Sequence, residues 1–414
     1  VGSRNFNGSI DGQVNGCLAV REAGSSLKPL LYALAMDEKG YLPNTIIDDR
    51  EQGYPADGSE TYIPKNYDLA YWGPLTIREA LGASRNIPAV SMIRAVGVPA
   101  FYTLLRKAGF DHMTCGPDHY GHGLALGTGG ASLMQLARVY AAIARGGMLL
   151  PVFIGEDRRG SPITAGGGAR LMTDKTARYI TGILADREIR RRASPGSRNF
   201  LDFPFEVAVK TGTSKDYRDA WTLGFTTRYV VGVWAGNFSG KPMKRVSGSW
   251  GSGRIFHQVM RLLTGREHPR FTRTDGFISL KICRTSGKRA RESCPSYRET
   301  FAPGDEPAGT CSLSHGSVHT YSADAVPTVL SPVAGETFVI DPLTPRHRQP
   351  VPVKISYSGD PAPGAMRYFF AVDDGQRRQV TRDIEEPLVL SRGRHRIMIY
   401  EGPAVINTVT FTIE

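Results

Sequence analysis

The sequence predicts a mixed α/β protein of the α+β type, in which helices flank an antiparallel sheet and a small β-sandwich follows. Apolar residues recur with helical spacing at 101–109 and 131–146. Strands with period-two alternation and short connections are expected between residues 205 and 236, which favours an antiparallel sheet. From about residue 325 apolar and polar residues alternate again, and this pattern is typical of an immunoglobulin-like sandwich.

The length of 414 residues exceeds what one compact core usually holds, so several domains are expected. We place them at 1–265, at 266–324 as a cysteine-containing linker segment, and at 325–414 as the β-sandwich. In the last of these, Val353 and Ile355 alternate with polar residues, and Asp374-Gly375 is a hairpin signal. The sandwich carries no catalytic constellation, so we expect it to bind or to act as a spacer.

The net charge of +12 indicates an anionic neighbour, which is nucleic acid, a membrane surface or an acidic polymer such as cell wall. The basic residues are dispersed and no nucleic-acid motif accompanies them, so no nucleic-acid partner is predicted; a solvated basic face is the alternative. No apolar run approaches the ~20 residues of a membrane span, and no signal peptide opens the chain. Because the first residue is Val1, we expect a piece of a longer protein whose anchor or export signal lies upstream.

The elements of the first 265 residues follow from local start and stop signals. Thr76 and Glu79 form a capping-box pattern, and Pro88 is placed to open a helix. In chain order we expect a strand at 17–20, a long surface segment at 40–74 that forms the wall of a site, a helix from Thr76 through Leu81, a helix from Pro88 to near Gly97, helices at 101–109, 131–146 and 170–185, strands at 205–209, 220–226 and 229–236, and a helix near 255–264.

Ser25 and Lys28 stand three residues apart where an apolar, helix-prone stretch begins. Residues at this spacing share a helix face, so the Lys28 amine is expected to reach the Ser25 hydroxyl. Pro29 belongs in a first helical turn, which places Ser25 at the helix N-terminus, where free N–H groups favour a developing negative charge. The pattern fits a serine nucleophile with its base. Taken alone, it is better explained as a capping serine beside an exposed lysine.

Two further motifs lie downstream. Ser84 and Asn86 fall on a tight connection between two expected helices, where they are either catalytic or simply a cap and a turn. Lys210-Thr211-Gly212-Thr213-Ser214 continues the strand that begins at 205. Glycine weakens a strand unless another backbone or a ligand approaches closely, so Gly212 predicts such an approach.

The three motifs occur in a fixed order, with 84 − 25 = 59 and 210 − 84 = 126 residues between their first members. That set resembles the signature of penicillin-binding proteins and serine β-lactamases. The surrounding sequence over about 5–265 resembles the transpeptidase domain of class A penicillin-binding proteins of the 1C subtype, and the similarity extends to the cysteine segment and the C-terminal β domain. The matching stretches are Val14-Asn15-Gly16, Gly24-Ser25-Ser26-Leu27-Lys28-Pro29, Arg218-Asp219-Ala220-Trp221 and Trp234-Ala235-Gly236-Asn237.

The resemblance implies acyl transfer on a penicillin-binding transpeptidase fold. Ser25 would attack the penultimate carbonyl of a D-alanyl-D-alanine stem peptide, with Lys28 as base because burial and Lys210 lower its pKa. Ser84 would relay a proton to the leaving amine. Asn86 would orient Lys28, and the backbone N–H groups of Ser25 and Thr213 would form the oxyanion hole. Lys210 would bind the substrate carboxylate, and Arg85 would narrow the cleft or bind an anionic group. The expected substrate-binding residues beside Lys210 are Thr211, Gly212, Thr213 and Ser214.

The same resemblance implies partners and a location. Peptidoglycan stem peptides and β-lactam antibiotics are the expected ligands, and the chemistry needs no metal or cofactor. The family is bifunctional, so the chain is expected to be the C-terminal fragment of a periplasmic glycosyltransferase/transpeptidase. The full-length protein would be tethered to the inner membrane by an anchor in its N-terminal part. The C-terminal domain would contact cell-wall or periplasmic proteins.

Other functions stay open beside the transpeptidase. A D,D-carboxypeptidase or a β-lactamase would pass the acyl group to water, although the Glu-x-x-x-Asn pattern of the class A deacylating kind is missing. A non-catalytic penicillin-binding sensor or scaffold is the alternative from another functional class. A β-lactam would acylate both an enzyme and a sensor, but only an enzyme would turn over a stem-peptide donor.

Of the five cysteines, Cys283, Cys294 and Cys311 lie close together in the sequence, with His315 and His319 behind them. A Cys3His zinc site is arithmetically possible, but the paired short Cys-x-x-Cys spacing is missing. In an exported protein a disulfide with one thiol left over is expected ahead of zinc, and free thiols are the third possibility.

Overall fold

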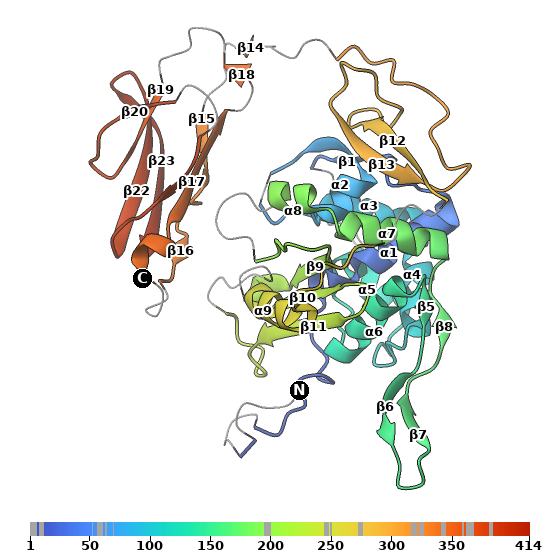
Figure 1. The fold of residues 1–414 in the computed structure, drawn as a ribbon. Helices are drawn as coiled ribbons and strands as arrows, with labels where there is room; N and C mark the ends of the chain where they lie inside the picture. Colours follow the sequence, from blue (N-terminus) through green and yellow to red (C-terminus); the bar gives the residue numbers. More distant parts are fainter. Residues whose placement is uncertain are drawn as a thin grey trace. The chain divides into compact units, whose positions relative to one another are not determined.

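The structure is a computed structural model of the chain (Figure 1). It describes residues 6–7, 12–51, 53–55, 61–62, 64–68, 70–193, 200–243, 248, 251–271, 276–315, 321–322, 327–340, 345–357, 360–361, 368–380 and 384–414. The chain divides into two compact units. The first contains residues up to Ala193 and Phe200–Ser312, and the second contains Leu313–Glu414.

The helices of the first unit agree closely with the sequence signals. They are η1 (Gly24–Leu27), α1 (Lys28–Lys39), α2 (Ile77–Gly82), α3 (Asn86–Val96), α4 (Val98–Lys107), α5 (Pro117–Tyr120), η2 (Gly121–Leu126), α6 (Leu133–Ala144), α7 (Asp174–Leu184), α8 (Arg187–Ala193), η3 (Lys215–Tyr217) and α9 (Ser252–Thr264). Both hydrogen bonds of the predicted capping box at Thr76 and Glu79 are present. Helix α3 begins at Asn86, two residues before Pro88, so the asparagine of the second motif lies in its first turn.

The expected strand at 17–20 is wrong. Leu18 and Ala19 donate their N–H groups to the Asn15 carbonyl, and the Cys17 N–H donates to Asn15 Oδ1 at 3.0 Å. Asparagine side chains that accept from the backbone two residues on are a common way to build a turn. The chain straightens only at Arg21, which forms an isolated bridge with Ala131.

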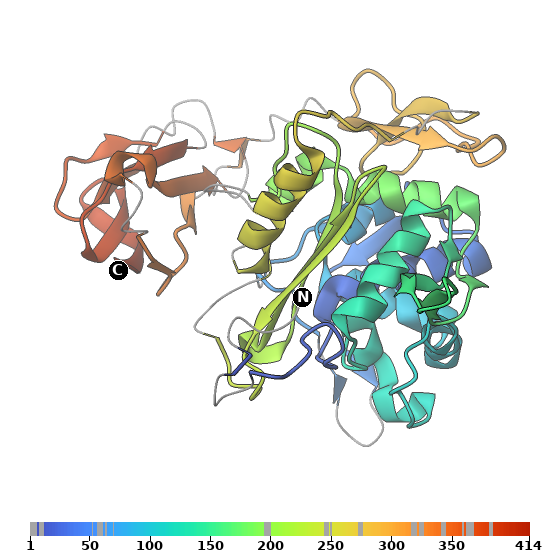
Figure 2. The same ribbon diagram turned by 60° about the horizontal axis from the view of Figure 1, so that its bottom comes forward.

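The central antiparallel sheet has the order β11-β10-β9. Its strands are β9 (Ala208–Thr213), β10 (Asp219–Phe225) and β11 (Val230–Gly236). Figure 2 shows the sheet lying between α9 and the other helices of the unit. Apolar side chains of α9 pack with Val209 and Val231 on one face, whereas Trp221 and Leu223 belong to the core shared with α1, α6 and α7 on the other.

The first unit also contains short antiparallel strand pairs outside the central sheet. The segment predicted as a site wall folds into the antiparallel pair β1 (Ile46–Asp49) and β4 (Gly73–Thr76), with β2 (Tyr54–Pro55) pairing β3 (Thr61–Tyr62). The other pairs are β5 (Met148–Leu149) with β8 (Ala169–Arg170), and β6 (Val152–Glu156) with β7 (Pro162–Ala165).

Residues expected to form a linker carry the antiparallel hairpin β12 (Ile278–Cys283) and β13 (Ser296–Phe301). The hairpin is attached to the helical part of the unit through Glu299, whose carboxylate accepts from Arg78 Nε at 2.5 Å and from Nη2 at 2.6 Å. The expected disulfide is not formed: all five cysteines belong to the described part of the chain, and each carries a thiol. The predicted His319 lies outside the described residues.

The second unit is a β-sandwich, as predicted. One sheet has the order β15-β17-β21 and the other β16-β23-β22-β19-β20. Side chains of both sheets share one core, which includes Val353 and Ile355 from the first and Phe370, Ile397 and Phe411 from the second. The strands are β14 (Tyr321–Ser322), β15 (Pro327–Ser331), β16 (Thr337–Phe338), β17 (Val351–Tyr357), β18 (Asp360–Pro361), β19 (Tyr368–Val372), β20 (Arg378–Gln379), β21 (Ile384–Leu388), β22 (Gly393–Glu401) and β23 (Ala404–Ile413), and the short helix η4 (Arg346–Arg348) precedes β17.

The hairpin predicted at Asp374-Gly375 is present between β19 and β20, with Asp373 in the left-handed region. Among the described residues, no single helix is long and apolar enough to cross a membrane. The pair α3 and α4, which bends by 92°, satisfies length and composition only when taken together.

Candidate active site

Ser25 lies in the single turn η1, directly before α1, as the sequence predicts. Its side chain is half-buried, and its carbonyl accepts the N–H of Lys28. Neighbouring elements fix the turn from both sides: Tyr140 Oη donates to the Ser26 carbonyl at 3.0 Å, and Trp221 Nε1 donates to the Glu22 carbonyl at 2.8 Å. These contacts hold the turn of the predicted nucleophile in one conformation, so it would not have to be ordered during a reaction.

Strand β9 passes directly against this turn. A Cβ added to Gly212 would lie 2.7 Å from the Ala23 carbonyl oxygen and 3.1 Å from the Ser26 nitrogen, so only glycine fits. Gly24 has a φ of +53°, and a Cβ there would lie 2.6 Å from the carbonyl oxygen of Thr213. The close backbone approach predicted from Gly212 is therefore confirmed. It places the backbone of Thr213 beside the residue that precedes Ser25.

Lys28 is fully buried beneath the turn. Its Nζ donates to the carbonyls of Ser84 and Arg85 at 2.7 and 2.9 Å and to Asn86 Oδ1 at 2.7 Å. These bonds attach Lys28 to the loop of the second motif, so the first and second motifs come together. The Ser25 hydroxyl is not among the hydrogen-bond partners of Lys28 Nζ in the described structure, so the expected bond between the two side chains is not formed. The predicted orientation of Lys28 by Asn86 is present in this geometry.

Lys210 joins the third motif to the second. Its Nζ donates to Ser84 Oγ at 2.5 Å and to the Thr211 carbonyl at 2.9 Å. Ser84 has a φ of +60°, in the left-handed region that few residues other than glycine adopt. Such strain is tolerated where the surrounding contacts fix the conformation, and here it aims the hydroxyl at Lys210.

The two lysines have lowered pKa values. Burial lowers the pKa of Lys28 well below its usual value, and the neighbouring cations Lys210 and Arg85 lower it further, whereas Asp49 opposes them. Burial lowers the pKa of Lys210 to about 7. At neutral pH Lys210 is therefore divided between its charged and neutral forms, and Lys28 beside it loses its proton more readily than an exposed lysine does.

Asn86 is anchored to the wall segment as well as to Lys28. Its Nδ2 donates to the Lys65 carbonyl, and its backbone N–H donates to Asn66 Oδ1, both at 2.8 Å. Asn66 is itself buried and donates to Asp49 Oδ1 at 2.7 Å. Sequence reasoning placed the 40–74 segment at the site, but it missed Asn66 and Asp49, which carry no motif.

Arg85 is buried and paired with carboxylates, so the predicted roles of narrowing the cleft or binding an anionic substrate group are wrong. Its side chain is 5% exposed and donates to Asp49 Oδ2 and Asp68 Oδ2, both at 2.7 Å, and to the Ala70 carbonyl. Its guanidinium also stacks on Trp72 at 4.9 Å. A buried cation is stable only when paired, and this one ties the wall segment to the loop that holds Lys28.

The residues after Lys210 divide into two groups. Thr211 and Thr213 are partly exposed and lie on one face of β9, and Thr213 Oγ1 accepts from the Gly248 N–H at 3.2 Å. Ser214 is buried, and its hydroxyl donates to Asp219 Oδ2 and accepts the Asp219 N–H, both at 2.9 Å. Its hydroxyl thus holds the turn between β9 and β10, which leaves Thr211 and Thr213 as the partly exposed hydroxyls of the predicted set.

A family comparison identifies this arrangement. Residues 3–260 match the family described as penicillin binding protein transpeptidase domain, and 273–316 match the penicillin-binding protein 1A C-terminal domain. The chain belongs to the penicillin-binding transpeptidase family. The resemblance to penicillin-binding proteins inferred from the sequence motifs is confirmed. The second match, at 273–316, lies within the 266–324 segment expected to be a linker.

Individual relatives agree with this assignment. Penicillin-binding protein 1C of Escherichia coli (strain K12) is 32% identical over 310 residues, which are 72% of this chain and 38% of that protein. Penicillin-binding protein 1A of Aquifex aeolicus (strain VF5) is 32% identical over 304 residues, or 71% of this chain and 40% of the relative. The chain thus spans about two fifths of the length of these curated relatives.

Solved structures confirm the fold class. A crystal structure of penicillin-binding protein 1A from Haemophilus influenzae superimposes with a TM-score of 0.60 at 22% identity, covering 72% of this chain and 50% of that one. PonA1 from Mycobacterium tuberculosis in complex with penicillin V gives a TM-score of 0.52 at 20% identity, with coverage of 68% and 76%.

Proposed function

We propose that this chain is a serine D,D-transpeptidase that cross-links peptidoglycan stem peptides through an acyl-enzyme. The observation that carries the proposal is the single cluster made by the three motifs. Lys28 is buried against Ser84, Arg85 and Asn86, and Lys210 donates to Ser84 Oγ at 2.5 Å. All of this lies beneath the turn that presents Ser25.

The proposed acylation step assigns a role to each of these groups. Ser25 Oγ attacks the penultimate carbonyl carbon of a D-alanyl-D-alanine donor, and neutral Lys28 takes its proton. The N–H groups of Ser25 and Thr213 stabilise the oxyanion of the tetrahedral intermediate. As the peptide bond breaks, Ser84 Oγ donates a proton to the nitrogen of the departing D-alanine and regains one from a neighbouring lysine.

Binding of the donor depends on the third motif. The terminal carboxylate of the donor pairs with protonated Lys210 and accepts hydrogen bonds from the hydroxyls of Thr211 and Thr213. An amine from a second stem peptide then attacks the acyl-enzyme, releases Ser25 and forms the cross-link. β-Lactams enter the same route as donors whose acyl-enzyme hydrolyses slowly, consistent with the penicillin V complex of the related PonA1.

The setting is inferred from the relatives. We place the chain outside the cytoplasm, in the periplasm, as the transpeptidase part of a longer membrane-tethered glycosyltransferase/transpeptidase. Its β-sandwich is proposed to bind cell-wall or periplasmic protein partners.

The nucleophile is tested by intact-protein mass after incubation with penicillin. The native chain should gain the mass of one penicillin, and Ser25→Ala should gain none. Ser26→Ala is the matched control, because its hydroxyl donates only to the Ala23 carbonyl at 2.6 Å in the same turn; it should keep the adduct. An adduct on Ser25→Ala would place the nucleophile elsewhere.

The reaction is tested with a stem-peptide donor, with and without an amine acceptor. A transpeptidase forms the cross-linked product when the acceptor is present. D-Alanine release with hydrolysis as the only outcome would identify a D,D-carboxypeptidase. A chain that forms the penicillin adduct but releases no D-alanine from the donor would be a sensor or scaffold.

A further inference from the structure

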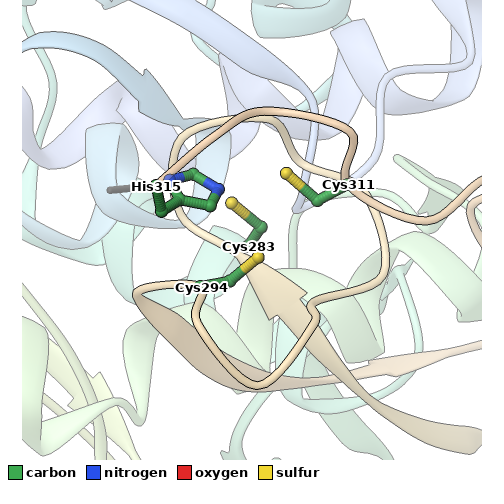
Figure 3. A group of neighbouring side chains, drawn as sticks. All are labelled: Cys283, Cys294, Cys311 and His315. Atoms are coloured by element: carbon green, nitrogen blue, oxygen red, sulfur yellow. The ribbon is translucent and has the colours of Figure 1, made fainter. Parts of the chain in front are cut away.

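Four metal-ligand side chains meet at the end of the β12–β13 hairpin, outside the active site. They are Cys283, Cys294, Cys311 and His315, and their ligand atoms all lie within 4.8 Å of one another (Figure 3). In Figure 3 the three sulfur atoms and the imidazole ring point toward a common centre. All four lie within the 273–316 segment that matches one family domain.

The backbone brings these residues together from distant points in the sequence. Cys283 is the last residue of β12, and its N–H donates to the Lys288 carbonyl at 2.9 Å, so the chain folds back immediately. Arg289 then links two segments, because it forms one isolated bridge with Ile282 and another with Thr310, and its carbonyl accepts the Cys311 N–H at 2.8 Å. Cys294 closes a second turn, in which the Arg291 N–H donates to its Sγ at 3.2 Å.

The cysteines take the place of a hydrophobic core in this part of the hairpin. Cys283 is 0% exposed, Cys294 8% and Cys311 2%, and among the described residues Ala290 is the partly buried apolar residue that packs against their cluster. Segments of this size bury too little apolar surface to hold their shape alone and commonly need a disulfide or a metal. Three thiols cannot all pair as disulfides, and a single bridge would leave the third thiol and the imidazole unused.

We propose that these four residues bind one structural zinc ion. Tetrahedral coordination with Zn–S bonds near 2.3 Å separates two sulfur ligands by about 3.8 Å, which lies inside the limit that the four groups already satisfy. Thiolate and imidazole are the ligand types that favour zinc, and four protein ligands leave no open position for substrate or water. The ion therefore organises the hairpin and takes no part in the acyl transfer.

The charge balance is consistent with this site. Binding releases the three thiol protons, and the three thiolates with Zn²⁺ leave a residual charge of −1. Arg289 and Arg291 lie on the turns that carry the ligands and add positive charge there, whereas Arg284 is paired with Glu79 and Glu188. The N–H···S hydrogen bond at Cys294 stabilises a thiolate more than a thiol, because the acceptor then carries the charge.

The site also has a mechanical role. The zinc-bearing hairpin holds α2 through Glu299 and Arg78, and Arg284 Nη1 donates to Glu79 Oε1 at 2.7 Å. The turn at Gly287 is also attached to the rest of the unit, because the Gly287 carbonyl accepts from Asn44 Nδ2 at 2.7 Å. Since α2 ends two residues before Ser84, an ordered hairpin supports the helix that leads into that loop.

The experiment measures zinc in the full 414-residue chain, purified under reducing conditions, stripped with a chelator and titrated with Zn²⁺. We expect about one zinc per chain, with a rise in Tm on binding. Cys311→Ser and His315→Ala should weaken zinc binding roughly tenfold or more. Cys115→Ser is the matched control, because that thiol is exposed and lies outside the cluster; it should bind zinc like the native chain.

Alkylation of the native chain provides a readout that needs no variant. Zinc should protect Cys283, Cys294 and Cys311 from a thiol reagent, a chelator should remove the protection, and Cys115 should react in both states. Several results would overturn the proposal: a native chain that takes up no zinc, equal binding by Cys311→Ser, iron in place of zinc, or a mass two hydrogens lower that shows a disulfide among the three cysteines.

Discussion

Replacing Arg85 with methionine tests whether the wall segment and the Lys28 loop are held together by a buried ion pair. The Arg85 side chain is 5% exposed and its partner Asp49 is 0% exposed, so the substitution strands a carboxylate in the interior. Breaking such a pair from one side costs about 3–5 kcal/mol, a large part of the 5–15 kcal/mol that stabilises a typical domain. The loss of a nearby cation also raises the pKa of Lys28, so acylation should slow at neutral pH.

Urea unfolding followed by tryptophan fluorescence measures this cost, because all four tryptophans lie between residues 72 and 250, within the first unit. Arg50→Met is the matched control, since Arg50 pairs with Asp48 at the exposed surface and should leave the unfolding free energy nearly unchanged. Adding Asp49→Asn to Arg85→Met removes the stranded charge and should recover part of the loss. If Arg85→Met cost no more than the Arg50 control, or if the second change deepened the loss, the buried-pair argument would fail.

Three further predictions concern the cluster itself. The pKa of Lys210 is about 7 in the folded chain and about 10.4 in the unfolded chain, so the unfolded state binds more protons between these two pH values. The unfolding free energy should therefore rise from about pH 7 to about pH 9, and Lys210→Met should flatten that rise. An unchanged slope in the variant would contradict the lowered pKa. Gly212→Ala places a methyl group 2.7 Å from the backbone of the Ser25 turn. The variant should lower the unfolding free energy by about 1–3 kcal/mol and slow penicillin acylation. Gly155→Ala, where a Cβ meets nothing within 4 Å, should do neither. Ser84→Ala keeps the backbone carbonyl that accepts from Lys28 but removes the hydroxyl that accepts from Lys210. Turnover of the stem-peptide donor should fall by about 10²–10⁴-fold, while the unfolding free energy changes little. Native turnover in this variant would exclude the proton relay.

Local signals explain what could be predicted from the sequence. The capping box at Thr76 and Glu79 and the glycine at 212 each express a requirement of their own neighbourhood, and the structure meets both. The strand expected at 17–20 is wrong because four apolar letters outweighed the turn-forming Asn15, whose side chain decides the local conformation.

Long-range pairing explains the rest. Arg85 stands between two motif residues, which suggested a role toward substrate, but its direction is set by Asp49, 36 residues earlier. The cysteines lie 294 − 283 = 11 and 311 − 294 = 17 residues apart, which resembles no short-spaced zinc motif. Their convergence depends on backbone contacts that the spacing does not show, such as the bridges of Arg289 to Ile282, next to Cys283, and to Thr310, next to Cys311. Partner choices of this kind depend on tertiary packing that no local pattern encodes.

The contact of Gly24 with Thr213 has a consequence for folding kinetics. The two segments that meet there are separated by 213 − 24 = 189 residues, so the nucleophile turn is completed only when distant parts of the chain have closed on each other. Contacts of such sequence separation form late and slowly. A partly folded chain, or a nascent chain that lacks β9, would contain Ser25 but not Thr213, the proposed second donor of the oxyanion hole. The fraction of molecules that penicillin labels covalently should therefore equal the fraction that has reached the native topology. The increase of this fraction with time should follow the refolding reaction.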